Sequence, residues 1–439
     1  MERLNAILEI ARANGAQQAE AFHVDNEESP VKFEANRLKE LNSRRTSGVA
    51  LRVIKDGRVG FASSTRPGDI EDLVKAAIET SPFGPEAHFD FPRQAEAPIV
   101  DTFDPETETF AIDNMIETGQ QVIDAVRGFE PELLCDAQLR RTVGTVTLAN
   151  SKGGSFTYRG SMLMMWLHGV LIHGTDMLFV GDVDASASPR LDTQRIKETI
   201  TWQLEHCRTN AKVRTAELPV IFTSSGVADA LLMPLTMAFS GRLVHQGQSP
   251  LAGKLSEELY DTRFSLRDDA TLHMRPASRP FDDEGVASRQ NVMIDKGVVS
   301  NFLYDLQTAG LAAAASTGSA ERSLASQPSI SPSNLIIAAG ETSFEDMVSS
   351  VKEGLIVEDL MGAGQGNVLG GDFSGNVLLG YKIESGEIVG RVKDTVVAAN
   401  VHDALRRLSA IGDEARWVNG TVYTPPLLFE SMAVSAKSS

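Results

Sequence analysis

The chain has 439 residues, of which 42% are hydrophobic and 23% are charged, and its formal net charge is −18. This length exceeds what one ordinary core accommodates, so two or three domains are expected. The acidic balance repels nucleic acid phosphates, and no apolar run approaches the roughly 18 residues of a membrane span. Neither nucleic acid nor membrane is therefore an expected partner.

Residues 1–100 are predicted to form an N-terminal region of mixed helix and strand. Leu4, Ile7 and Ala11 trace one face of an opening helix, which lacks the basic leader and apolar block of a signal peptide. A cytoplasmic location is therefore expected. The two cysteines, Cys135 and Cys207, give no disulfide framework, which agrees with a reducing compartment.

Strands are predicted after this helix, followed by a second helix and a loop. The strand-like runs are Ala19–Val24, Val31–Leu41 and Gly48–Ser64. The last run alternates around Asp56-Gly57, which is a strong hairpin signal. Ile70–Glu79 has helical spacing with Asp69 as its expected N-cap, and Pro82–Pro105 is predicted to be a linker.

Residues 106–212 are predicted to form a central domain. Helices are expected over Ile112–Arg127 and Thr193–Arg208, where apolar residues recur with helical spacing. Strand-like runs lie between these helices, over Glu132–Thr142, Thr145–Asn150, Gly154–Gly160 and Met162–Ile172.

Residues 213–439 are predicted to form a large C-terminal domain, which begins with the apolar strand Leu218–Phe222. Gly226–Phe239 has helical character, and Pro234 is expected to kink it or to end its first half. The whole pattern predicts an α+β protein, with a mixed α/β region followed by a mainly antiparallel sheet with helices.

Later turns support the antiparallel sheet. Hairpins are predicted over Val292–Val299 and Tyr381–Ile388. Thr342 and Glu345 match a capping box for a helix over Phe344–Gly354.

The acidic turn Asp282-Asp283-Glu284 is the densest group of carboxylates. Three carboxylates could bind a divalent cation, but an EF-hand loop needs ligands at alternate positions and a distant glutamate. A solvated turn that leads into the next strand is the favoured interpretation, and its functional role is left open.

The stretch Leu231–Arg242, LLMPLTMAFSGR, is informative because of the side chains it offers. Zinc binds imidazole, thiolate or carboxylate groups, which alkyl and thioether groups do not replace. The eight histidines of the chain form no HExxH or HxxxH pair. No catalytic, cofactor-binding or metal-ligating residue is therefore assigned in this chain.

Several segments share their order and spacing with a known family. They are GVALRVIKDGRVGFASS at 48–64, LPVIF at 218–222, SPLAGKLSEE at 249–258, RPFDDEGV at 279–286, GVVSNFLYD at 297–305 and GLIVEDLMGAGQGNVLGGDFSG at 354–375. Taken together, they resemble the TldD/PmbA family, which is known as modulators of DNA gyrase and as intracellular metallopeptidases.

The resemblance points to one of two branches of this family. In the metal-bearing branch, a helical His-Glu-x-x-x-His motif and a cysteine close to the C-terminus bind zinc. Here Leu232, Met233 and Met237 fall roughly where the ligands and the base would lie, and no cysteine follows Cys207. The sequence therefore resembles the PmbA (TldE) branch.

This resemblance implies a non-catalytic subunit that forms a heterodimer with a TldD-like metallopeptidase. No cofactor is expected in this chain, and zinc is expected in the partner. The implied substrates are unfolded peptides and the leader peptides of ribosomally made precursors. Two other classes stay open: an autonomous peptidase or hydrolase with an unrecognised site, and a regulatory protein-binding module of the gyrase-modulator type.

Overall fold

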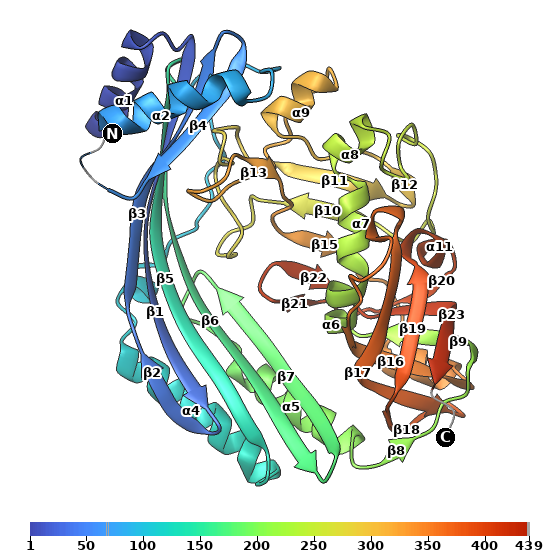
Figure 1. Cartoon of the computed structure of the whole chain (residues 1–439). Coiled ribbons are helices and arrows are strands. Elements are labelled where there is room, and N and C mark those ends of the chain that lie inside the picture. The colour runs from blue at the N-terminus through green and yellow to red at the C-terminus, as the bar shows by residue number, and fades with distance from the viewer. Residues whose placement is uncertain (67, 69, 437–439) are drawn as a thin grey trace.

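A long, curved antiparallel sheet forms one side of the molecule, and the C-terminal half of the chain forms the other side (Figure 1). The computed structural model describes residues 1–66, 68 and 70–436. Within this part of the chain, no helix combines the length and the apolar character needed to cross a membrane. Asp69, the predicted N-cap, lies outside the described residues.

The curved sheet has the strand order β4-β3-β1-β5-β6-β7, and β2 pairs with β1. Its strands are β1 (Gln18–Glu34), β2 (Arg37–Leu41), β3 (Arg44–Lys55), β4 (Arg58–Ser64), β5 (Leu134–Asn150), β6 (Ser155–His173) and β7 (Asp176–Ser186). The predicted hairpin is confirmed, because β3 and β4 pair around Asp56 and Gly57. Both turn residues have positive φ, 50° and 72°, as a tight hairpin turn requires.

Strands that the sequence pattern divides are continuous in the structure. β1 runs through the polar stretch Asp25–Glu28, where the apolar alternation is lost. β3 and β5 pair with β1 on either side along this stretch, so main-chain hydrogen bonds maintain the strand where apolar burial does not. The predicted breaks within 132–150 and 154–172 are likewise absent from β5 and β6.

The regions predicted as separate N-terminal and central domains share this sheet. β1 comes from residues 1–100 and β5 from residues 106–212, and the two strands pair from Glu20–Asn150 to Phe33–Ala137. The predicted boundary therefore falls between strands of one sheet. The division into domains 1–100, 106–212 and 213–439 stays a prediction.

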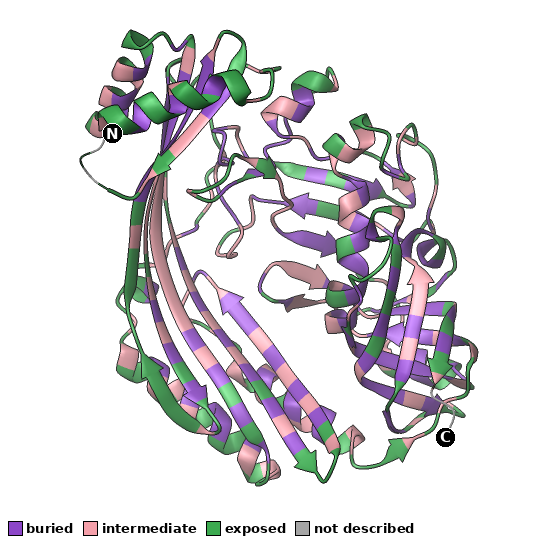
Figure 2. Ribbon diagram, viewed as in Figure 1, coloured by how far each residue is buried: buried purple, intermediate pink, exposed green. Residues whose placement is uncertain are grey.

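Side chains alternate between the two faces of the curved sheet (Figure 2). On one face, the odd-numbered residues of β1 pack against four helices. Ala19 and Ala21 of β1 pack in one cluster with residues of two helices, and Phe33 packs in a second cluster with residues of two others. These helices are α1 (Glu2–Ala13), α2 (Ile70–Thr80), α4 (Ile112–Phe129) and α5 (Thr193–His206). Phe22 and its even-numbered neighbours face away from these helices.

The C-terminal half contains two further sheets. The eight-stranded sheet comprises β8 (Asn210–Ala211), β9 (Ala216–Phe222), β16 (Glu353–Met361), β17 (Asp372–Glu384), β18 (Glu387–Val392), β19 (Thr395–Asn400), β20 (Leu408–Ile411) and β23 (Leu427–Ala436). The six-stranded sheet comprises β10 (Leu266–Asp269), β11 (Gln290–Asp295), β12 (Val298–Val299), β15 (Leu335–Ile337), β21 (Arg416–Val418) and β22 (Val422–Thr424). Most neighbouring strands in both sheets are antiparallel, so the predicted α+β class is confirmed.

Short helices and one two-stranded ribbon complete this half. They are α6 (Ser224–Gly226), α7 (Leu232–Ala238), α8 (Gly241–His245), α9 (Leu306–Leu311), α10 (Phe344–Ser350), α11 (Val401–Arg406), and the strands β13 (Ala320–Glu321) and β14 (Ser329–Ile330). The predicted capping box is displaced by one residue. Ser343, not Thr342, is the N-cap of α10, and its hydroxyl accepts a hydrogen bond from the amide of Asp346. The helix ends at Ser350, earlier than predicted.

Helix α9 lies against the segment Pro82–Pro105, which follows α2, and this contact provides a stability test. A Cβ atom on Gly310 would lie 1.7 Å from the carbonyl oxygen of His88, which the backbone must move to avoid. Gly310→Ala is therefore expected to lower the free energy of unfolding by about 1–3 kcal/mol in urea titration. Gly128 of α4 has no such neighbour, so Gly128→Ala is expected to be neutral or slightly stabilising. Equal stability of the two variants would contradict this contact.

Candidate functional site

The segment that contains α7 is irregular at its start. Val227–Leu231 forms a π-helical turn, and α7 follows it at once. Pro234 lies in the first turn of α7 and has no N–H to donate to the carbonyl of Ala230, which accounts for the wider turn at this point. Pro234 was predicted to kink the helix or to end its first half; it lies inside α7, which continues to Ala238, and the departure from α-helical geometry is in the turn before it.

The three α7 residues that the resemblance singles out have different surroundings. Leu232 is 4% exposed and belongs to the core between the two C-terminal sheets. Met233 is 53% exposed, and Met237 is half-buried. A zinc ion does not fit these positions, because they offer one alkyl group and two thioethers. Among the described residues, no group of three or more His, Cys, Asp or Glu side chains is arranged to hold a metal ion.

A cavity of about 360 Å³ lies beside the π-helical turn, between β7 and the eight-stranded sheet. Asp229 of the turn and Asp359 of β16 both line it, together with His168 of β6. Burial and the charge of Asp359 raise the pKa of Asp229 to about 6. Glu358, on the same wall, accepts hydrogen bonds from Gln203 at 2.8 Å and from the Tyr381 hydroxyl at 3.0 Å.

The acidic turn Asp282-Asp283-Glu284 is buried, so its interpretation as a solvated turn was wrong. The three residues are 1%, 6% and 1% exposed, respectively. The turn lies against the face of the curved sheet that carries the even-numbered residues of β1, β3, β5 and β6, where Phe281 packs against Phe156 with ring centroids 5.0 Å apart and ring planes inclined by 52°. Tertiary contact with a sheet more than 100 residues away in sequence removes these carboxylates from water.

A buried ion network joins this turn to the curved sheet. Arg52 of β3 donates hydrogen bonds from Nε and Nη2 to the two carboxylate oxygens of Glu20, both at 2.9 Å. Its Nη1 donates to Glu284 at 2.8 Å. Arg322 approaches Glu20 at 2.8 Å and lies over the ring of Phe22. We call Glu20, Arg52, Glu284 and Arg322 the buried ion network.

The predicted linker Pro82–Pro105 also contacts this network. Phe91 is 2% exposed, and its ring centroid lies 5.2 Å from the Arg52 guanidinium. The carbonyl of Pro92 accepts a hydrogen bond from Asn150 at 2.8 Å. This segment therefore covers the sheet as a packed strap, although little of it is regular helix or strand.

The two carboxylates that Arg52 joins have opposite pKa shifts. Burial acts to raise the pKa of Glu20, but the charges of Arg322 and Arg52 outweigh it, and the pKa lies below its ordinary value. Burial raises the pKa of Glu284 to about 7 against the opposing charge of Arg52, and the nearby charges of Asp282 and Asp305 add to this rise. Arg52 therefore joins one carboxyl whose pKa lies below its ordinary value to another whose pKa lies above it.

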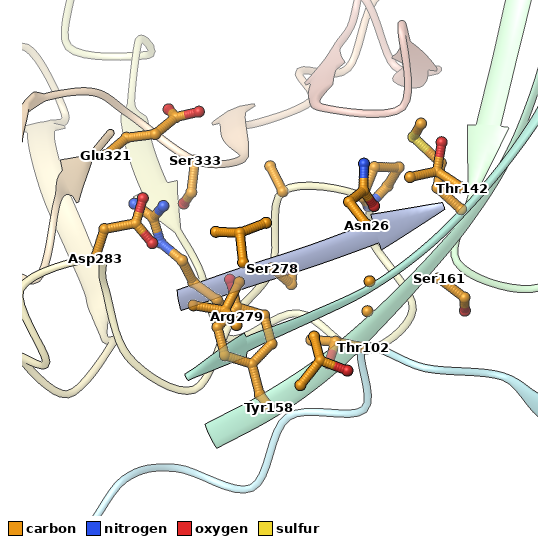
Figure 3. Close-up of a pocket in the computed structure, with 18 of the residues that line it drawn as sticks. Asn26, Thr102, Thr142, Tyr158, Ser161, Ser278, Arg279, Asp283, Glu321 and Ser333 are labelled. Atoms are coloured by element: carbon orange, nitrogen blue, oxygen red, sulfur yellow. The ribbon is translucent and has the colours of Figure 1, made fainter. Parts of the chain in front are cut away.

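A second cavity, also about 360 Å³, opens next to the network (Figure 3). The sheet side contributes Asn26, Thr142 and Tyr158, and the C-terminal half contributes Arg279, Asp283, Glu321 and Ser333. Figure 3 shows Asn26 and Thr142 on one side of the pocket and Asp283, Glu321 and Ser333 on the other, with Tyr158 beside Arg279. We call this cavity the sheet pocket. Sequence reasoning missed it, because its walls come from segments far apart in the chain.

Comparison with known proteins gives two family matches. The model described as the PmbA/TldA metallopeptidase C-terminal domain matches residues 215–436. The model described as PmbA/TldA metallopeptidase domain 1 matches residues 19–81.

Individual relatives agree with these matches. The chain is 24% identical to TldE from Thermococcus kodakarensis, with a TM-score of 0.89 over 99% of this chain and 100% of that one. A structure from Thermotoga maritima that bears the gyrase-modulator name has a TM-score of 0.88 and 21% identity, over 99% of each chain. Metalloprotease PmbA of Escherichia coli is 27% identical, over 85% of this chain and 82% of its own length.

Proposed function

Because the chain belongs to the PmbA/TldD metallopeptidase family, we propose that it is a PmbA/TldE-like subunit of a heterodimeric peptidase. Its partner is a TldD-like zinc metallopeptidase, and the pair works in the cytoplasm on unfolded or leader peptides. One observation carries this proposal: α7 has Leu232 in the core and thioethers at Met233 and Met237, a set of side chains that zinc does not bind.

In this proposal the partner supplies the metal, and this chain supplies binding surface. Zinc in such a partner would polarise the scissile carbonyl and activate a water molecule. The chain contributes one wall of an enclosed peptide chamber.

The direct test is metal analysis of the pure chain and of its complex. We expect less than about one zinc per ten chains for the isolated protein, and one zinc per heterodimer after co-expression with a TldD-like subunit from the same host. Peptide cleavage is expected only in the complex and should be lost on chelation. Zinc near one per chain, with cleavage in the absence of a partner, would refute the proposal.

A matched variant separates this proposal from an autonomous hydrolase. Asp229 lines the cavity beside the π-helical turn, and its raised pKa is a property that acid–base catalysts often share. If the isolated chain cleaves peptides and Asp229→Asn abolishes that cleavage, the autonomous alternative is correct. A stable complex with another class of protein and none with a TldD-like subunit would favour a regulatory module.

A further inference from the structure

The floor of the sheet pocket is built from the even-numbered face of the curved sheet. Asn26 of β1 pairs with Gly144 of β5, which pairs with Gly160 of β6. Two residues further along these strands, Val146 of β5 pairs with Tyr158 of β6, and both side chains lie on the same face as the two glycines. The space over Gly144 is taken by the Asn26 side chain, whose Oδ1 lies 2.7 Å from where a Cβ atom would stand, so the gap in this floor is the one over Gly160.

The gap at Gly160 is open. A Cβ atom there would meet only the carbonyl oxygen of Thr102, at 3.8 Å, which is ordinary van der Waals contact. Backbone strain does not require glycine at this position, because its φ lies outside the left-handed region.

The opposite wall carries a buried guanidinium that has an unused donor. Arg279 is 8% exposed, and its Nε has no hydrogen-bond partner among the described residues. The hydroxyl of Thr142, on the sheet side of the same pocket, is also buried without a partner in this part of the chain. Buried polar groups are rarely left without partners, so two in one cavity indicate a ligand with oxygen acceptors.

The charges of the pocket decide which kind of oxygen it accepts. Asp283 and Glu321 line it together with Arg279 and Arg322, so the pocket has no excess of positive charge. In a pocket with balanced charges, a further full negative charge would lose its hydration without a net electrostatic attraction in return. A neutral carbonyl oxygen can accept from the Arg279 guanidinium without this cost.

We propose that the sheet pocket binds a segment of peptide main chain. A carbonyl oxygen of the peptide accepts a hydrogen bond from Arg279, and one small or medium apolar side chain occupies the gap over Gly160. The choice of a peptide as ligand rests on the proposed function, whereas the recognition of a neutral carbonyl rests on the pocket itself.

Filling the gap tests the proposal without disturbing the fold. Gly160→Val should place a β-branched side chain in open space on a strand, so the melting temperature is expected to be unchanged or higher. The probe is the tripeptide Ala-Leu-Ala with an acetylated N-terminus and an amidated C-terminus, added to the full chain and followed by ligand-observed NMR. We expect saturable binding to the wild type and at least about tenfold weaker binding to Gly160→Val.

Arg279→Met removes the donor and keeps an unbranched apolar chain. The loss of a hydrogen bond from a charged group is expected to weaken binding of the same peptide about tenfold. Arg289→Gln is the matched control, because Arg289 is exposed and does not line the pocket, and its affinity should equal that of the wild type. The proposal would be overturned if Gly160→Val bound the capped peptide as tightly as the wild type. It would also be overturned if the wild type bound Ala-Leu-Ala only when the C-terminal carboxylate was left free.

The outcomes also separate this inference from the proposed function. If the complex cleaves peptides and peptide binding is insensitive to Gly160→Val, only the proposal about the sheet pocket is refuted. If Gly160→Val weakens peptide binding but the chain forms no complex with a TldD-like subunit, only the proposed heterodimer is refuted.

Discussion

Replacing Arg52 with methionine is expected to lower the free energy of unfolding by about 3–5 kcal/mol. Arg52 is 3% exposed and holds Glu20 and Glu284, which are 0% and 1% exposed. Without the guanidinium, Glu284 loses its arginine partner in the network, and Glu20 retains only Arg322. A buried carboxylate that loses its cation must either stay unpaired or take up a proton, and either outcome costs more than the net contribution of the pair. Urea titration monitored by circular dichroism measures the change.

The same strand offers a matched control. Arg45 also pairs with a carboxylate, Asp25, at 2.6 Å, but its side chain is 69% exposed. Arg45→Met is expected to leave the unfolding midpoint nearly unchanged, because water screens such a pair. If Arg52→Met prevents folding, the double variant Arg52→Met/Glu284→Gln should recover soluble protein, because Glu20 then remains paired with Arg322 and Glu284 carries no charge. Equal midpoints for Arg52→Met and Arg45→Met would contradict the network as described.

Replacing Glu284 with glutamine is expected to change how stability depends on pH. The folded pKa of Glu284, about 7, lies above its ordinary value of 4.5. The native state therefore binds more protons than the unfolded state between these values, and its stability falls as the pH rises from about 4.5 to 7. Glutamine does not ionise. The free energy of unfolding of the variant, relative to that of the wild type, is therefore expected to rise by up to about 3 kcal/mol from pH 5 to pH 8.

Glu20→Gln provides the opposite case within the same network. The pKa of Glu20 is lowered, so its ionised form contributes stability that is fully present above its ordinary value of 4.5 and is lost only as the pH falls through the lower, folded value. The difference between Glu20→Gln and the wild type should therefore stay constant from pH 5 to pH 8. Urea titrations at several pH values measure both variants. Parallel pH profiles for wild type and Glu284→Gln would show that Glu284 is fully ionised in the native state.

Local signals in the sequence predicted the turns and helices well. The hairpins at Asp56-Gly57, Lys296-Gly297 and Ser385-Gly386 all form, and each of these residues has positive φ. Such turns depend on the backbone preferences of two adjacent residues, which the sequence states directly. Long helices such as α4 and α5 follow from apolar spacing in the same way.

Strand continuity and the displaced cap at Ser343 were not predictable from pattern alone. β1 remains a strand through polar residues because strands from elsewhere in the chain pair with it. At α10, Ser343 and Thr342 offer the same hydroxyl chemistry, and the choice between them depends on where the chain arrives from the preceding loop.

The sequence by itself determined the family resemblance and the chemistry of α7, because both depend on which side chains stand in a given order. The tertiary structure alone decided the environment of the acidic turn and the existence of the sheet pocket. Glu284 meets Arg52 across 232 positions of sequence, and the pocket joins β1, β5 and β6 to loops of the C-terminal half. Burial and pairing of a charge depend on such distant neighbours. The carboxylates of Asp282, Asp283 and Glu284, which the sequence pattern predicted to be solvated, are therefore buried.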